Sequence, residues 1–224
     1  IVGNQEQRVS ELMECLEYFS QLKAGREKGP ANIDLLTMMA RDAVTKDQPP
    51  HEFLGNLLLL IVGGNDTTRN SMSGSVNAFN QYPSELEKLR GKPNLIDNAV
   101  SEIIRWQTPL AHMRRTALDD MDLSGYKIRT GDKVVMWYLA GNRDETVFKN
   151  SNRLDIERTN ARKHLAFGFG IHRCLGMRLA EMQLKILWIE ILNRWRRVEV
   201  VGPIVRVPSN FVNGYSSMPV MLVA

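Results

Sequence analysis

The ten residues from Phe167 to Gly176 constrain this chain more than any other feature, because they place one cysteine in a glycine-rich loop before an apolar helix. Gly168, Gly170 and Gly176 surround Cys174, and glycine lets a backbone pass close to a flat ligand. The start of a helix favours negative charge, which stabilises the thiolate form that binds metal ions. A lone cysteine is more often an inert buried thiol. The glycine-rich setting favours the metal ligand here.

This loop resembles the haem-binding loop of the cytochromes P450, the haem-thiolate monooxygenases. Their pattern is Phe, a glycine-rich turn, a basic residue, Cys, any residue and Gly, and residues 167–176 meet every fixed position. The loop lacks the third glycine of a dinucleotide-binding loop, and Cys174 has no Cys-x-x-Cys partner for zinc or a c-type haem. The resemblance implies haem b with Cys174 as the thiolate ligand of its iron, and haem contacts from Phe167, Gly168, Gly170, Gly176 and, on a distant helix, Gly63.

The composition is that of an ordinary globular protein, with 43% hydrophobic and 24% charged residues in 224. A net charge of +4, from 29 basic and 25 acidic side chains, is too small and dispersed for a nucleic-acid partner. The longest apolar run, residues 57–62, is far shorter than the roughly 20 residues of a membrane span. Cys15 and Cys174 make no disulfide framework, so we expect a cytoplasmic protein without a membrane span.

The chain begins without an initiator methionine or a secretory segment. Together with the resemblance, this leads us to expect that residues 1–224 are the C-terminal part of a single haem-thiolate monooxygenase domain whose N-terminal half is absent. The expected fold is mainly α with small β elements. It should comprise a long central helix, a Glu-x-x-Arg helix, the cysteine loop and the helix that follows.

Helical periodicity predicts most of this fold. An apolar face over residues 12–19 and a break at residues 25–30 indicate two short helices before Pro49-Pro50. A long helix is predicted over about residues 52–81, apolar all round in its first half and therefore crossing the middle of the fold. Pro83 ends it.

The next predicted helix runs from a capping box formed by Asn94 and Asp97 to Trp106. Its buried stripe should be Ile96, Val100 and Ile103. After it, residues 126–128 and 134–137 flank a glycine-containing turn and predict a hairpin. A coil over residues 142–166 leads to the cysteine loop, and residues from 203 onward read as short β segments. The helix after the loop carries an apolar stripe of Leu175, Leu179, Met182, Ile186 and Ile189.

The long central helix contains a weak point. Gly63 and Gly64 each destabilise a helix by roughly 1 kcal/mol relative to alanine. Thr67 lies four residues after Gly63, so its hydroxyl can bond the Gly63 carbonyl and bend the helix. The alternative is a close helix crossing with solvated polar residues. The segment resembles the family's central helix, which carries an acid–alcohol pair that relays protons during oxygen activation, and the resemblance assigns this catalytic role to Asp66 and Thr67.

Glu102 and Arg105 share one helix face, which by itself usually means a solvated ion pair. The resemblance makes them the family's Glu-x-x-Arg motif and makes Arg153 the arginine that joins it. Such a network would pin the coil before the cysteine loop. This chain has Leu154 where the family more usually has Phe after that arginine.

The resemblance also places His172 and Arg115 where the family binds the haem propionates with cationic or donor groups. His112, Arg114 and Arg115 can equally form a basic turn, and Arg114 can take the place of Arg115. His51 and His164 are interpreted as structural or surface residues. A basic cluster around the cysteine loop is either a docking face for an acidic ferredoxin or solvated surface, and consists of Arg162, Lys163, Arg173, Arg178 and Lys185.

The implied activity is insertion of one oxygen atom of O2 into an unactivated C–H bond of a small apolar substrate. The implied partners are ferredoxin and an NAD(P)H-dependent ferredoxin reductase. Residues 63–74, 105–116 and 140–145 resemble a bacterial subgroup that hydroxylates medium-chain alkanes at the terminal carbon, so an alkane or fatty acyl chain is expected, with terpenes and sterols as alternatives. The expected pocket lining is Leu110, Ala111, Met113, Phe211 and Val212.

Two other functions stay open. The first is a catalytically silent, truncated haem-binding module. The second is a haem enzyme that uses peroxide or rearranges its substrate without outside electrons, and the presence of Asp66 and Thr67 argues against it.

Overall fold

The computed structural model describes residues 4–30 and 32–224, apart from the side chain of Arg8. It divides into two compact units, residues 1–63 and residues 64–224. Helix α3 (Pro50–Gln81) runs through the boundary between them. Each unit is described separately below.

The first unit contains α1 (Gln5–Lys28), α2 (Leu35–Arg41) and the beginning of α3. Two helices before the double proline are confirmed, although α1 has 24 residues and is not short. The Asp34 carboxylate caps α2 by accepting hydrogen bonds from the Thr37 backbone N–H (2.8 Å) and hydroxyl (2.7 Å). These bonds lower the pKa of Asp34. A small core is formed by Met39, Phe53 and Leu57, with Phe19, Leu36 and Leu60 packed against it.

The predicted long helix is confirmed, and α3 begins two residues earlier than expected. Pro83 starts the next helix, α4 (Pro83–Gly91), in the first-turn position that suits proline. The small core of the first unit covers only one side of the first half of α3. Phe53, Leu54 and Leu57 are buried there, whereas Leu59, Ile61 and Val62 are exposed.

The core of the second unit is built around α5 (Ile96–Gln107). The predicted stripe of Ile96, Val100 and Ile103 is buried, as expected. The predicted capping box is wrong, since Asn94 belongs to a 3-10 turn, η1 (Pro93–Leu95), that runs directly into the helix. That turn bonds the Ile96 N–H to the Pro93 carbonyl, and no side chain caps α5.

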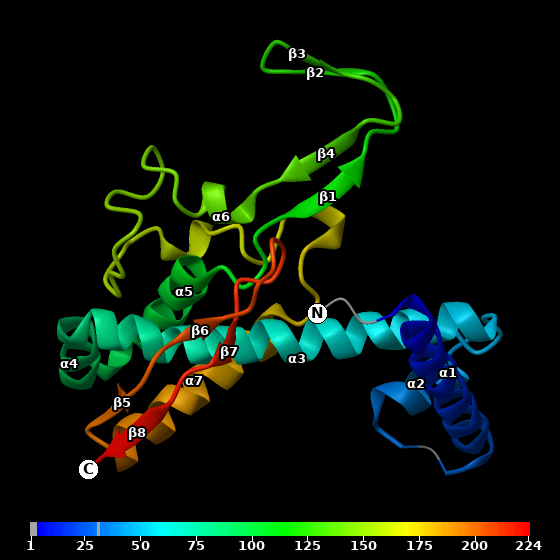
Figure 1. The fold of residues 1–224 in the computed structure, drawn as a ribbon, viewed down its shortest axis with the longest axis horizontal. Coiled ribbons are helices and arrows are strands. Elements are labelled where there is room, and N and C mark those ends of the chain that lie inside the picture. Colours follow the sequence, from blue (N-terminus) through cyan, green and yellow to red (C-terminus); the bar gives the residue numbers. More distant parts are fainter. Residues whose placement is uncertain (1–3, 31) are drawn as a thin grey trace. The chain divides into compact units, whose positions relative to one another are not determined.

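Helix α7 (Met177–Arg194) packs beside the second half of α3 (Figure 1). The Trp188 indole N–H donates to the Ser75 hydroxyl at 2.8 Å, and the rings of Phe79 and Trp188 meet edge to face at 4.6 Å. The buried face of α7 consists of Leu184, Trp188 and Ile191. The predicted apolar stripe is on the uncovered side, where Leu179, Met182, Ile186 and Ile189 are exposed.

Strand β1 (Met113–Thr116) pairs with β4 (Lys133–Met136), and β2 (Met121–Leu123) pairs with β3 (Tyr126–Ile128). The predicted pairing of residues 126–128 with 134–137 is therefore wrong. The two-residue turn between β2 and β3, Ser124-Gly125, has positive φ at both positions (53° and 84°), the conformation that best joins two twisted strands. This hairpin projects beyond the β1–β4 pair (Figure 1).

The coil from residue 142 onward is confirmed, with helix α6 (Tyr138–Gly141) before it and a 3-10 turn, η2 (Ala161–Lys163), inside it. The short C-terminal β segments are also confirmed. Strand β5 (Arg197–Val200) pairs with β8 (Val220–Val223), and β6 (Val205–Arg206) pairs with β7 (Tyr215–Ser217). No helix in the described ranges is long and apolar enough to cross a membrane.

Candidate functional site

The cysteine loop, residues 167–176, connects the coil to α7 and leaves Cys174 exposed. The Cys174 N–H donates to the Phe167 carbonyl at 2.9 Å, so the loop closes on its own first residue. Gly168 and Gly170 have positive φ of 67° and 77°, a conformation that favours glycine. A 3-10 turn, η3 (Gly170–His172), precedes the cysteine. Helix α7 begins at Met177, so Cys174 lies before the helix and not within its first turn.

Two kinds of glycine shape this loop. A Cβ at Gly168 would lie 2.9 Å from the hydroxyl oxygen of the buried Tyr138, so α6 supports the loop from within. A Cβ at Gly170 or Gly176 would meet no heavy atom within 4 Å. Packing inside the described chain therefore requires glycine at position 168 and leaves open space over positions 170 and 176.

Three apolar side chains of the loop are exposed to solvent, whereas Phe167 packs against the core. Phe169, Ile171 and Leu175 are 84%, 98% and 93% exposed, next to the exposed Cys174. Such a concentration of exposed apolar side chains marks a binding surface in a folded protein. The loop thus offers one thiol within an apolar surface.

His164 stands just before the loop and is structural. Its Nδ1 accepts the Ala166 N–H at 3.3 Å, and its ring lies 5.2 Å from that of Phe167. Burial, together with the nearby positive charges of Arg105 and Arg173, lowers the pKa of His164 to about 4. The imidazole is therefore neutral at pH 7, and the side chain is partly buried.

The two candidate arginines of β1 lie on opposite faces of the strand. Arg115 is half-buried on the face of Met113, whereas Arg114 is exposed. The Arg115 guanidinium donates to the Arg114 carbonyl at 3.0 Å. His172 is exposed at the end of η3.

Helix α3 is continuous through its double glycine. Gly63 is exposed, and Asp66 and Thr67 are partly exposed. The Asp66 carboxylate forms an ion pair with the Arg69 guanidinium at 2.8 Å, one turn along the helix. The Thr67 carbonyl accepts the Ser71 hydroxyl at 2.8 Å.

Glu102 and Arg105 form a fully buried pair at the centre of the second unit, and both are 0% exposed. Arg105 donates through Nε to Oε2 (2.7 Å) and through Nη2 to Oε1 (2.8 Å) of Glu102, the two-point geometry that makes such pairs strong. Its Nη1 donates to the carbonyls of Asn142 and Ser151, both at 2.7 Å. The expected Glu-x-x-Arg network is therefore present.

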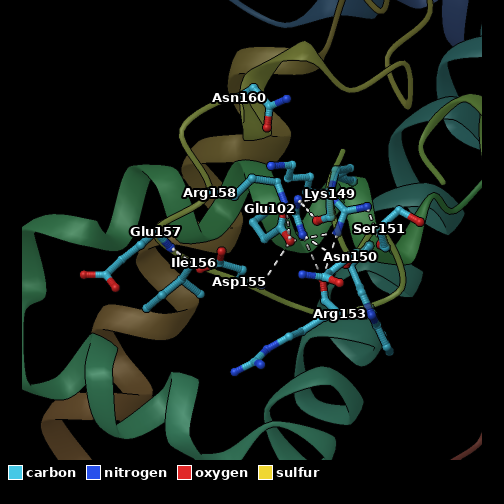
Figure 2. A network of polar contacts seen from close by, with 12 residues as sticks. Glu102, Lys149, Asn150, Ser151, Arg153, Asp155, Ile156, Glu157, Arg158 and Asn160 are labelled. Atoms are coloured by element: carbon cyan, nitrogen blue, oxygen red, sulfur yellow. Dashed lines mark hydrogen bonds and ion pairs between the residues drawn. The ribbon is translucent and has the colours of Figure 1, made fainter. Parts of the chain in front are cut away.

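The third member of the network is Arg158. Its Nε lies 3.0 and 3.1 Å from the two carboxylate oxygens of Glu102. The predicted member, Arg153, contributes only its backbone carbonyl, which accepts from Arg105 (3.1 Å) and Arg158 (3.2 Å). Its side chain points away from Glu102 (Figure 2), so the prediction for Arg153 is wrong.

A period-two burial pattern explains why Arg158, and not Arg153, joins the network. Leu154, Ile156 and Arg158 are buried in alternation with more exposed residues, as expected for an extended segment with one face inward. The alternation Leu-x-Ile-x-Arg was visible in the sequence and would have indicated Arg158.

The expected pocket residues of two distant segments lie side by side. Leu110 and Val212 form an isolated antiparallel bridge, and the Ala111 N–H donates to the Phe211 carbonyl at 2.8 Å. The ring of His112 lies 5.5 Å from that of Phe211. The structure therefore brings together four of the five predicted pocket residues, while Met113 follows on β1.

Buried amides and one phenol hold this junction together. Tyr215 donates its hydroxyl proton to Gln107 Oε1 (3.0 Å) and accepts from Asn77 Nδ2 (3.1 Å). The Gln107 amide donates to the Asn213 carbonyl at 2.6 Å. Burial raises the pKa of Tyr215. The cluster ties α3, α5 and the C-terminal segment into one unit, and sequence periodicity gave no signal for it.

A family model described as Cytochrome P450 matches residues 23–203. The chain belongs to the cytochrome P450 family. Linalool 8-monooxygenase of Pseudomonas putida is 43% identical over 211 residues, covering 93% of this chain and 50% of the relative. Methyl-branched lipid omega-hydroxylase of Mycobacterium bovis is 37% identical over 171 residues, covering 75% of this chain and 40% of the relative.

Among solved structures, Cytochrome P450-153 from Novosphingobium aromaticivorans is 51% identical, with a TM-score of 0.92. That match covers 97% of this chain and 54% of the other. The fold is therefore part of the cytochrome P450 fold. The chain spans about half the length of the curated relatives it matches.

The cytochrome P450 family implies haem, and the residues of the cysteine loop fit such a group. A flat apolar macrocycle needs an exposed thiol, apolar neighbours and a backbone without protruding side chains. Cys174 supplies the first, and Phe169 and Ile171 supply the second. The open space beside Gly170 and Gly176 supplies the third.

Proposed function

We propose that the protein carrying this chain is a haem-thiolate monooxygenase that uses Cys174 as the ligand of the haem iron. The observation that carries the proposal is the exposed Cys174 on a glycine-shaped loop with apolar neighbours, in a chain of this family. When bound, the haem supplies the activation of O2, with the balance RH + O2 + two electrons + two protons giving ROH + H2O. Residues 1–224 would then be one part of a single larger domain.

The haem carboxylates would be held by Arg115 and His172. The structure favours Arg115 over Arg114, because Arg115 shares the less exposed face of β1 with the predicted pocket residue Met113. His172, exposed two residues before Cys174, can reach a carboxylate on the same ligand. A guanidinium or imidazolium bonded to a carboxylate forms a charge-assisted hydrogen bond.

Asp66 and Thr67 would move protons. The Asp66 carboxylate is partly exposed, so it can exchange protons with water once its pairing with Arg69 opens. The Thr67 hydroxyl is the next polar group along α3 and would hold a proton for the reacting oxygen. General acid catalysis of this kind typically contributes a factor of about 100 to 10,000.

The substrate would be an apolar chain, and the proposed reaction is terminal hydroxylation of an alkane or fatty acyl chain. The adjacency of Leu110, Ala111, Phe211 and Val212 supports an apolar pocket wall. The names of the two curated relatives, an 8-monooxygenase of linalool and an omega-hydroxylase of methyl-branched lipids, support oxidation of a carbon in an apolar chain.

Electrons would come from ferredoxin and its NAD(P)H-dependent reductase in the cytoplasm. Four basic residues near the cysteine loop are exposed, namely Arg162, Lys163, Arg173 and Arg178. Lys185 is instead paired with Asp97 at 2.8 Å. If the four cations dock an acidic partner, the electron-transfer rate should fall as ionic strength rises, and a rate independent of salt would contradict the docking role.

The test is the absorption spectrum of the reduced, carbon monoxide-bound protein. It should be recorded on this chain after haem addition and on a joined protein, in which the N-terminal half of the Novosphingobium relative precedes this chain. A strongly red-shifted Soret band that disappears in Cys174→Ser would support thiolate ligation. Absence of the band in both proteins would overturn it.

The second candidate is a haem-binding module without turnover. It is favoured by the span of the chain, about half of its relatives, and by the exposed stripe on α7. A band in both proteins, with substrate hydroxylation by the joined protein alone, would support this assignment for the isolated chain.

A further inference from the structure

We propose that Asn142 is the positioning residue that fixes the cysteine loop to the Glu102–Arg105 pair. Asn142 is 0% exposed and lies at the end of α6. Its carbonyl accepts from Arg105 Nη1 at 2.7 Å, and its side-chain Oδ1 accepts the Leu165 N–H at 2.6 Å. One residue therefore bonds the network on one side and the residue two positions before Phe167 on the other.

The connection continues from Leu165 into the loop. The Leu165 carbonyl accepts the Gly168 N–H at 2.8 Å, which forms the turn that brings Gly168 against Tyr138. Two residues later in the chain, the Phe167 carbonyl accepts the Cys174 N–H at 2.9 Å. Hydrogen bonds thus run from Arg105 through Asn142 to the two turns that hold Cys174.

The position needs a side chain that both donates and accepts. The Thr108 hydroxyl donates its proton to the Arg105 carbonyl at 2.6 Å, so it can only accept from Asn142 Nδ2, 2.8 Å away. This fixes the orientation of the amide and turns Oδ1 toward the Leu165 N–H. An ionised aspartate could not donate to Thr108, and a leucine would leave the Leu165 N–H without its acceptor.

Packing supports the same joint. A Cβ at Gly141 would lie 2.8 Å from the Leu165 side chain, so Leu165 sits directly on the backbone beside Asn142. The Asn142 N–H donates to the Tyr138 carbonyl at 2.9 Å, which ties the amide to the helix that supports Gly168. Loss of the Asn142 side chain should therefore loosen the loop before it loosens α5 or α7.

The role of Asn142 toward a thiolate ligand rests on the proposed function, whereas its hold on the loop is measurable without haem. The variant is Asn142→Leu, and the matched control is Asn160→Leu, which removes another coil amide that bonds a carbonyl, that of Val147 at 2.6 Å. Hydrogen exchange by mass spectrometry is followed in peptides from residues 165–176, from α5 and from α7, in this chain and in the joined protein.

We expect exchange of the loop amides to accelerate about tenfold or more in Asn142→Leu, since a buried donor loses its partner, with smaller changes in α5 and α7. Asn160→Leu should leave the loop unchanged. Unchanged loop exchange in Asn142→Leu would overturn the proposal, as would equal acceleration in the loop, α5 and α7.

A second variant covers the case in which Asn142→Leu does not fold. Thr108→Val keeps the hydrogen bond from the Leu165 N–H to Asn142 and removes the hydroxyl that orients the Asn142 amide. It should therefore accelerate exchange in the same loop peptides, but by less than Asn142→Leu does. Loop exchange equal to that of the unaltered protein in Thr108→Val would then count against the proposal.

The two proposals fail separately. Cys174→Ser keeps the backbone N–H that bonds Phe167, so it should abolish the red-shifted band and leave loop exchange unchanged. In the joined protein, Asn142→Leu should still bind haem, and its reduced, carbon monoxide-bound form should convert faster from the red-shifted to the blue-shifted, thiolate-free spectrum. If Asn142 had only a general structural role, the variant would bind less haem, and the rate of this conversion would not change.

Discussion

The guanidinium Nε of Arg158 lies 3.0 Å from one carboxylate oxygen of Glu102 and 3.1 Å from the other. The same carboxylate accepts two hydrogen bonds from Arg105 and one from the Asp155 N–H at 3.0 Å. A buried charge is tolerated only when it is paired and hydrogen-bonded. The stability of the second unit should therefore depend on all three charged side chains.

We expect Arg158→Leu to lower the free energy of unfolding by about 3–5 kcal/mol, because breaking a buried pair leaves a charge without its partner. Arg153→Leu alters the arginine that was predicted to join the network but does not bond Glu102, and it should change the free energy of unfolding by less than about 0.5 kcal/mol. Urea unfolding followed by circular dichroism measures both. Equal losses in the two variants would contradict the assignment of Arg158.

The pKa of His164, lowered to about 4 by burial, makes stability depend on pH. The folded state disfavours the imidazolium, so between pH 6.5 and 4 the unfolded state binds more protons. The contribution is complete above pH 6.5 and is lost as the pH falls toward 4, amounting to about 3 kcal/mol in all. His164→Gln should remove this contribution to the pH dependence of the free energy of unfolding, measured by urea unfolding between pH 7 and 4. An equal pH dependence in the two proteins would refute it.

Gly168→Ala should destabilise the protein by about 1–3 kcal/mol, since alanine at a φ of 67° is strained and its Cβ would press on the Tyr138 hydroxyl. Tyr138→Phe should recover part of the loss, as a double-mutant cycle by thermal unfolding can show. Gly176→Ala is the control, because its Cβ meets no atom within 4 Å. No coupling between positions 138 and 168 would mean that backbone strain alone is responsible.

Thr67→Ala in the joined protein should keep the haem spectrum and divert electrons to peroxide, because the hydroxyl that holds a proton for the reacting oxygen is gone. The measurement is the ratio of hydroxylated product to NAD(P)H consumed, with peroxide determined in parallel. Ser71→Ala, whose hydroxyl bonds the Thr67 carbonyl, is the control on the same helix. Unchanged coupling in Thr67→Ala would remove Thr67 from the proposed relay.

Local chemistry in the sequence was enough to predict the glycine-rich turn of the cysteine loop, and the family resemblance predicted the network around the Glu102–Arg105 pair. Gly168 and Gly170 have the positive φ that a glycine-rich turn implies, and the two charged residues one turn apart on α5 do meet. Helix periodicity likewise predicted α3 and the buried stripe of α5. Each of these features is decided within a few residues of the chain.

The capping box at Asn94 and Asp97 failed for a local reason, because the 3-10 turn η1 runs directly into α5. The other errors depend on which segments pair or pack together in the fold. The third arginine was assigned to position 153 by its place in a motif, although the inward face of the extended segment carries Arg158. The hairpin was assigned to the turn at Gly131, although Ser124-Gly125 closes β2 on β3 and a second pairing joins β1 to β4. The apolar pattern of α7 indicated the stripe that is exposed and not the buried face of Leu184, Trp188 and Ile191, because the helix is apolar on two sides and α3 and α5 cover the other one.

The guanidinium groups of Arg105 and Arg158 bind the coil through its backbone carbonyls, those of Asn142, Lys149, Asn150, Ser151 and Arg153. Figure 2 shows Arg158 beside Lys149, Asn150 and Arg153. Every amino acid offers the same carbonyl group, so these bonds do not depend on the identity of the exposed side chains of Asn152 and Arg153. The two arginines donate hydrogen bonds to the backbone carbonyls of an irregular segment, as the N–H groups of a neighbouring strand do in a sheet. Exposed positions such as Asn152 and Arg153 should therefore accept varied residues in a randomised library, while positions 105 and 158 accept only arginine.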